Sequence, residues 1–122
     1  IEGTGLFPPR GAPRVLWLGV KDDSGGLARL HQRLEDECEA TGFPRETRAF
    51  NPHLTIARLR NPEGVRPLAS LHTTTEFTSR PFDVREFVLM RSQLGPGGSR
   101  YTALSHHPLN SNLKSSTLKS EI

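Results

Sequence analysis

A histidine and a threonine stand two positions apart at His53 and Thr55, within a stretch of apolar and β-branched residues. Alternate side chains of a strand project from one face, so these two would lie roughly 6.6 to 6.8 Å apart on the same side. Histidine exchanges protons near neutral pH, and a threonine hydroxyl can donate to a phosphate oxygen. The pair favours acid–base chemistry on a phosphodiester, although the tripeptide alone favours a structural histidine in a half-buried strand.

The residues around this pair predict short strands and one clear helix. Residues 14–20 form an apolar run between turn-forming segments, which indicates a buried strand, and residues 53–59 indicate a second strand. Between them, apolar residues recur at helical spacing, and the helix ends before Gly42 and Pro44. The stripe of this helix consists of Leu27, Leu30, Leu34 and Cys38, and Cys38 is interpreted as a small core residue.

The second half of the chain predicts a short helix and a hairpin. Residues 65–71 can form a helix with Pro67 in its first turn. Residues 82–90 resemble a strand whose alternation changes phase, as a β-bulge would require. Residues 101–104 would return antiparallel after a loop at 95–98 that is longer than the two-residue type. The fold class predicted is therefore α+β, an antiparallel sheet with one or two packed helices.

The composition argues against a membrane-spanning, secreted or disulfide-stabilised protein. The chain has a net charge of +3, with 34% hydrophobic and 24% charged residues, and no apolar run approaches the roughly 18 residues of a membrane span. No secretory signal opens the sequence. One cysteine excludes an internal disulfide and a thiolate-rich zinc site, so we expect a cytoplasmic protein with no metal. The slight basic excess would help a polyanion approach.

The segment from Phe50 to Arg58, Phe-Asn-Pro-His-Leu-Thr-Ile-Ala-Arg, resembles the second His-x-Thr-x strand of the LigT-like 2H phosphoesterases, the RNA 2′,3′-cyclic phosphodiesterases and 2′-5′ RNA ligases. The similarity extends over about residues 3 to 104. Upstream it includes Phe7-Pro8 and the run from Pro13 to Val20, and downstream it includes Ser92-x-Leu94-x-Pro96-x-Gly98 and Tyr101-x-x-Leu104.

This resemblance implies half of a bilobal, pseudo-symmetric fold, with residues 1–105 as its C-terminal part. It implies that His53 activates water, that Thr55 binds the phosphate and that Arg58 contacts the terminal base. A straight strand would point Arg58 to the other face from His53, so its role requires a strand end or a bulge. The alternative interpretation is a solvated or salt-bridged arginine.

The activity implied is hydrolysis of RNA 2′,3′-cyclic phosphate ends to 2′-phosphates, with reversible 2′-5′ ligation and no cofactor. Family members carry two His-x-Thr-x strands and this chain has one, so we expect the isolated chain to be nearly inactive without the missing half or a second chain. The alternatives are a noncatalytic module that binds RNA ends or nucleotides, and a truncated half-domain that self-associates.

The other histidines and the end of the chain receive structural interpretations. His72-Thr73-Thr74 repeats the pattern after the second predicted helix and is expected to be a loop coincidence. His31 is expected to be structural, and the adjacent His106 and His107 would be poor joint metal ligands. Residues 106–122 are rich in Ser, Asn and Lys, and the polar stretch that begins at Ser105 predicts a flexible tail.

Overall fold

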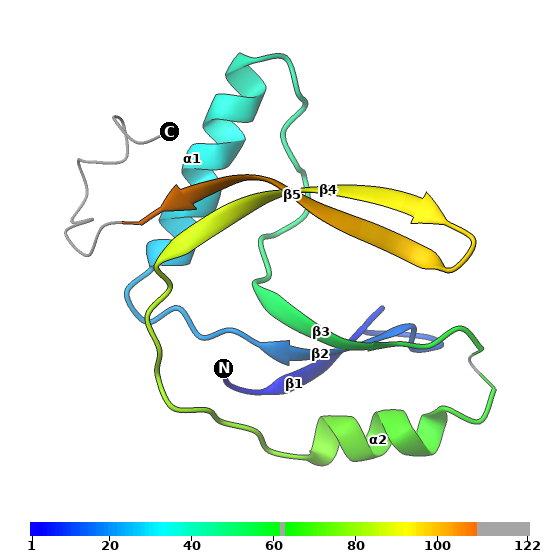
Figure 1. Cartoon of the computed structure of the whole chain (residues 1–122). Helices are drawn as coiled ribbons and strands as arrows, with labels where there is room; N and C mark the ends of the chain where they lie inside the picture. The colour runs from blue at the N-terminus through cyan, green and yellow to red at the C-terminus, as the bar shows by residue number, and fades with distance from the viewer. Residues whose placement is uncertain (62, 110–122) are drawn as a thin grey trace. The chain divides into compact units, whose positions relative to one another are not determined.

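The computed structural model describes residues 1–61 and 63–109, which form two compact units divided between Pro81 and Phe82. The first unit holds β1 (Thr4–Phe7), β2 (Val15–Gly19), α1 (Gly26–Ala40), β3 (His53–Arg58) and α2 (Arg66–Thr74). The second holds β4 (Glu86–Gly95) and β5 (Gly98–Pro108) (Figure 1). All paired strands are antiparallel, so the predicted α+β class is confirmed. No helix among the described residues is long and apolar enough to cross a membrane.

The first unit is built on a three-stranded sheet in which β2 lies between β1 and β3. The strand β1 has no strong pattern of its own and was not predicted; it forms by pairing with β2, from Thr4 with Leu18 to Phe7 with Val15. The register between β2 and β3 shifts once: Trp17 pairs with Thr55 but Leu16 pairs with Ala57. Residue 56 is therefore the extra residue of a β-bulge.

Helix α2 covers one face of this sheet (Figure 1). Thr4 at the edge donates a hydrogen bond to the carbonyl of Thr75, just beyond the helix, at 3.5 Å. Leu16 (3% exposed) and Ala69 of α2 are both buried. Pro67 lies in the first turn, as predicted. The helix continues to Thr74, so the expectation that residues 72–74 form a loop is wrong.

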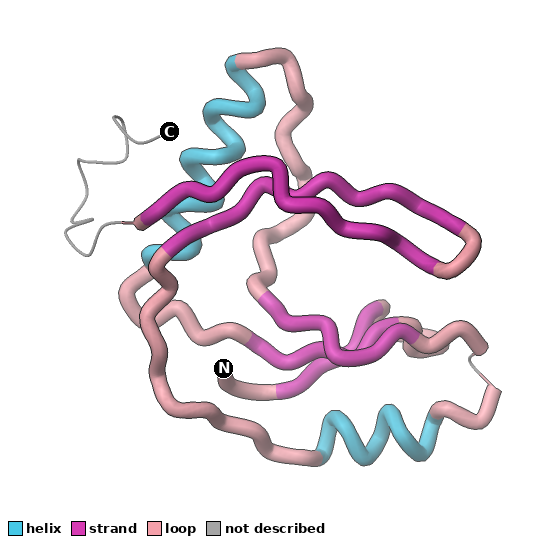
Figure 2. The backbone as a smooth tube through the Cα atoms, viewed as in Figure 1, coloured by secondary structure: helices cyan, strands magenta, loops and turns pink. Residues whose placement is uncertain are grey.

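Helix α1 follows the predicted periodicity, and Asp22 supplies its N-terminal acceptor, 3.0 Å from the amide of Ala28. Leu30 is buried on the stripe, whereas Cys38 at the far end is exposed. The prediction that Cys38 is a core residue is therefore wrong, because burial of the stripe decreases toward the end of the helix. Residues 41–52 then lead to β3 without regular structure (Figure 2).

The hairpin of the second unit differs from its prediction in three ways. The strand β4 begins at Glu86, so the phase change before it is not a bulge; the register instead shifts between Leu89 and Met90. Gly95 pairs with Gly98, which leaves a tight two-residue loop rather than a longer one. Gly98 has a φ of 112°, a conformation that favours glycine. The strand β5 continues to Pro108, so the predicted tail begins too early; residues 110–122 lie outside the described residues.

Candidate active site

The side chains of His53 and Thr55 share one face of the sheet. His53 pairs with Gly19 and Thr55 pairs with Trp17. These partners are two residues apart on β2, which contains no extra residue, so their side chains alternate regularly. Cross-strand partners project to the same side, and the intervening Leu18 and Leu54 project to the other. We call the side that carries His53 and Thr55 the site face; α2 lies on the opposite face. His53 is exposed and Thr55 is half-buried, so the imidazole is open to solvent.

The imidazole of His53 is fixed by its own chain. Its Nδ1 lies 2.6 Å from the carbonyl oxygen of Asn51. A carbonyl can only accept a hydrogen bond, so Nδ1 carries the proton, and in the neutral ring Nε2 then has a free lone pair. No described residue forms a hydrogen bond with Nε2. The ring therefore offers a base at Nε2 when neutral and a proton donor there when charged.

Two aromatic rings stand beside this imidazole. The ring of Phe7 meets it edge-on, with centroids 5.0 Å apart, and the Trp17 indole lies 6.2 Å from it. Phe7 and Trp17 are themselves 5.3 Å apart. The indole lies across the backbone of Gly5, its register partner, where a Cβ atom would overlap the six-membered ring. The absence of a side chain at Gly5 thus lets Trp17 lean toward β1 and away from Thr55.

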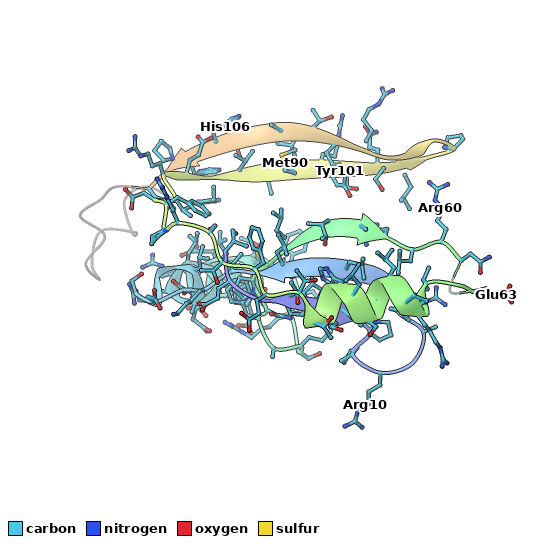
Figure 3. All side chains as sticks on the ribbon, turned by 90° about the horizontal axis from the view of Figure 1, so that it is seen from below. Arg10, Arg60, Glu63, Met90, Tyr101 and His106 are labelled. Carbon is cyan, nitrogen blue, oxygen red and sulfur yellow. The ribbon has the colours of Figure 1, made fainter. Side chains whose placement is uncertain are left out.

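The bulge resolves the position of Arg58. Arg58 pairs with Val15, which lies on the same face of β2 as Trp17 and Gly19 because the three are spaced two residues apart. Because the extra residue at position 56 shifts the alternation, Arg58 lies at a site-face position together with His53 and Thr55. Arg60 extends from the loop that follows β3 (Figure 3). The end of β3 thus adds one cationic group, Arg58, to the face that carries the imidazole.

The segment that leads into β3 is attached to α1. The ring of Phe50 stacks on His31, with centroids 4.1 Å apart and planes 9° from parallel. The amide of Glu46 donates to a carboxylate oxygen of Glu35 at 2.9 Å. Arg48 holds the pKa of Glu46 at about 2 through side-chain hydrogen bonds. The structural interpretation of His31 fits this contact.

The remaining histidines have local partners. In α2, the Nε2 of His72 lies 3.1 Å from the carbonyl of Gly5 and 2.9 Å from that of Trp17, so it donates to β1 and β2. His106 lies 3.4 Å from Glu86, and His107 stacks on Phe87. Among residues 1–61 and 63–109, no group of three or more His, Cys, Asp or Glu residues gathers as metal ligands would.

A family model described as the 2′-5′ RNA ligase superfamily matches residues 1–96. The chain belongs to this superfamily. The resemblance stated from the sequence is thereby confirmed, and the match includes all three strands of the sheet that carries His53.

Individual proteins with known names or structures are also similar to this chain. An RNA 2′,3′-cyclic phosphodiesterase of Archaeoglobus fulgidus is 38% identical over 105 residues, which is 84% of this chain and 57% of that protein. One of Geobacillus stearothermophilus is 33% identical, over 89% of this chain and 34% of that protein. The crystal structure of TT0787 of Thermus thermophilus is 32% identical with a TM-score of 0.66, over 88% of this chain and 57% of that one.

The chain spans about half the length of most of the curated relatives that it matches. The sequence pattern singled out His53, Thr55 and Arg58 as candidate site residues, and the register with β2 places all three on one face of the sheet. It did not find the Asn51 carbonyl or the aromatic pair of Phe7 and Trp17. The only sequence signal for that pair is the aromatic residues themselves, because their contacts depend on pairing between strands.

Proposed function

We propose that the protein to which this chain belongs hydrolyses 2′,3′-cyclic phosphate ends of RNA to 2′-phosphates, and that it joins RNA ends reversibly through a 2′-5′ linkage when a 5′-hydroxyl attacks in place of water. The observation that carries the proposal is the exposed imidazole of His53, whose Nδ1 donates to the Asn51 carbonyl while no described residue binds its Nε2. The names of the relatives support the same chemistry. We place the protein in the cytoplasm, since its one cysteine forms no disulfide within the chain.

In the proposed reaction, Nε2 of His53 accepts a proton from a water molecule whose oxygen attacks the phosphorus atom. The bond between phosphorus and the ribose 3′ oxygen breaks, and the 2′-phosphate remains on the sugar. The hydroxyl of Thr55 donates to a nonbridging oxygen, where negative charge increases. Arg58 contacts the terminal nucleotide. Two histidines manage both protons, so the proposal includes neither a metal nor a nucleotide cofactor.

The leaving 3′ oxygen requires a proton, which we assign to a second histidine outside the described strands. His72-Thr73-Thr74 does not supply it, because these residues lie in α2 and His72 donates to backbone carbonyls. We propose that the second His-x-Thr-x strand comes from residues beyond this chain or from a second chain. The strand β3 is an edge of its sheet, and Leu54 and Ile56 on it are 52% and 50% exposed, which leaves room for another element.

A second candidate function is binding of RNA ends without hydrolysis. It is favoured by one observation, the single His-x-Thr-x strand in these 122 residues. In that case Thr55 and the arginines would hold the phosphate, and His53 would act only as a hydrogen-bond partner. Binding of a cyclic-phosphate oligonucleotide together with undetectable hydrolysis in the complete protein would favour this function.

The decisive experiment follows a dinucleotide with a 2′,3′-cyclic phosphate by phosphorus NMR. The complete protein should produce the 2′-phosphate, resist EDTA and lose activity on His53→Ala, whereas His106→Ala, in the other unit, should keep it. The 122-residue chain alone should be nearly inactive, and light scattering should show whether it self-associates. A 3′-phosphate product, or full activity of the monomeric chain, would contradict the proposal.

A further inference from the structure

We propose that Pro52 is a positioning residue for His53, because its ring holds the Asn51 carbonyl against Nδ1 of the imidazole. The inference rests on the proposed function, in which Nε2 of His53 is the base. The inference identifies the residue that determines which nitrogen of the His53 ring carries the proton and which has the lone pair. Pro52 itself touches neither water nor phosphate in this scheme.

The carbonyl of Asn51 belongs to the peptide unit that joins Asn51 to Pro52. The carbonyl of Pro52 accepts a hydrogen bond from the amide of Val20, just beyond β2, at 3.2 Å, which ties this residue to the sheet. From that fixed point, the direction of the Asn51 carbonyl depends on two rotations, the ψ and φ angles of residue 52, and φ is the one that turns the Asn51–Pro52 peptide unit itself. In proline the ring restricts φ to about −65° within 15°.

This restriction has a direct consequence for the imidazole. The sheet fixes the backbone of His53 at the start of β3, and Pro52 fixes the carbonyl that its Nδ1 reaches at 2.6 Å. Both partners of the hydrogen bond are therefore set by the backbone, without help from another side chain. A residue with free φ at position 52 would let the carbonyl swing away and the ring exchange its tautomer.

The attachment of the preceding loop to α1 offers a competing explanation. Phe50 stacks on His31, and this contact also restrains the chain before Asn51. However, rotations within Asn51 can absorb a movement of Phe50 while the Asn51–Pro52 peptide unit stays in place. The two explanations therefore predict different results for substitutions at Pro52 and at His31.

The test measures the tautomer of His53 in the ¹⁵N-labelled 122-residue chain by long-range nitrogen–proton NMR, in the neutral form of the ring. The wild-type chain should have its proton on Nδ1. In Pro52→Ala the ratio of the Nδ1–H to the Nε2–H form should fall by about threefold to tenfold, the equivalent of one ordinary hydrogen bond. Pro52→Gly, with still freer φ, should lower the ratio further.

Matched controls separate this effect from general loosening. His31→Ala removes the Phe50 stack and should leave the ratio unchanged, and Asn51→Ala, which keeps the carbonyl, should also leave it unchanged. Protection of the Val20 amide from hydrogen exchange reports whether the sheet end is intact in each variant. If protection of the Val20 amide is lost in Pro52→Gly, the tautomer ratio in Pro52→Ala decides whether Pro52 positions the ring.

The outcomes are distinct. An unchanged ratio in Pro52→Ala, or an equal loss in His31→Ala, would overturn the role of Pro52 and leave the proposed function intact. A wild-type ring with its proton on Nε2 would instead contradict the assignment of Nε2 as the base. In a catalytically complete form, Pro52→Ala should lower kcat in proportion to the fraction of rings with the proton on Nδ1, while KM stays constant.

Discussion

Replacing Gly5 with alanine would test the packing that shapes the candidate active site. The Trp17 indole lies directly over Gly5, and an added Cβ would overlap its six-membered ring. Neither partner can yield easily, because Gly5 is paired with Trp17 in the sheet and the indole contacts Phe7. Gly5→Ala must therefore displace the indole, and with it the aromatic neighbour of His53.

Overpacking of this kind costs about 1 to 3 kcal/mol. A displaced indole also loses part of the aromatic pairing with Phe7, worth roughly 0.5 to 1.5 kcal/mol beyond area burial. We expect Gly5→Ala to lower the free energy of unfolding by about 2 kcal/mol, measured by urea unfolding with the fluorescence of Trp17, the one tryptophan in the sequence. Gly97→Ala is the matched control, because no atom lies within 4 Å of a Cβ there, and it should stay within about 0.5 kcal/mol.

A double-mutant cycle isolates the contact. In a Trp17→Leu background the ring is absent, so Gly5→Ala should cost little, and the two substitutions should be coupled by about 1 to 3 kcal/mol. Circular dichroism would follow unfolding in this background. If the two losses in the free energy of unfolding were additive, the added methyl group would be straining the backbone at position 5 rather than colliding with the Trp17 ring. A stable Gly5→Ala protein with an unchanged NMR spectrum of His53 would refute the packing argument altogether.

Four further outcomes are expected. His53→Ala in the complete protein should lower hydrolysis by about 10² to 10⁴-fold, yet change stability by no more than about 0.5 kcal/mol because the ring is exposed; a large loss of stability would instead indicate a structural histidine. His72→Ala should cost about 1 to 3 kcal/mol in urea unfolding, since it removes a half-buried donor from two sheet carbonyls. Arg58→Gln should raise KM for an RNA end more than it lowers kcat, and an unaffected KM would remove Arg58 from the site. The pKa of the Glu46 carboxylate should be about 2 by carbon NMR and should rise toward its ordinary 4.5 in Arg48→Gln, which removes the side-chain hydrogen bonds but keeps the backbone amides of residues 47 and 48 as donors; because the folded pKa is depressed, its stabilisation is present above about pH 4.5 and lost as the pH falls toward 2.

The elements with their own periodicity were predictable from the sequence. The strands β2 and β3 and the helix α1 were predicted to within a few residues, because each has an apolar run or a helical stripe that stands out in its own sequence. In contrast, β1 is four residues long and exists through its pairing with β2. The lengths of β4 and β5 follow from the tight turn at Pro96 and Gly97, which aligns the two strands over their whole length.

The candidate site divides in the same way. The alternation of a strand was enough to place His53 and Thr55 on one face. The side on which Arg58 lies depended on a bulge that arises from the register with β2 and has no signature in the sequence of β3. The aromatic neighbours of His53 come from β1 and β2, more than 30 positions away in the sequence. Contacts of that kind follow from sheet order, which local patterns do not determine.

The exposure of His53 has a consequence for how the proposed reaction would gain its rate. In open water, a hydrogen bond from Thr55 or a charge on Arg58 stabilises a phosphoryl transition state only weakly, because the solvent screens both. In the proposed function, the element that completes the site would lie over the site face, because α2 covers the other face of the sheet. Such an element would supply the second histidine and also exclude water, which strengthens each of these interactions. Joining the proposed second His-x-Thr-x strand should therefore increase activity by more than the effect of adding one general acid. Restoring the strand with its histidine replaced by alanine separates the two contributions: this variant should still bind the RNA end more tightly than the 122-residue chain, and equal affinity would show that the added strand supplies only a proton.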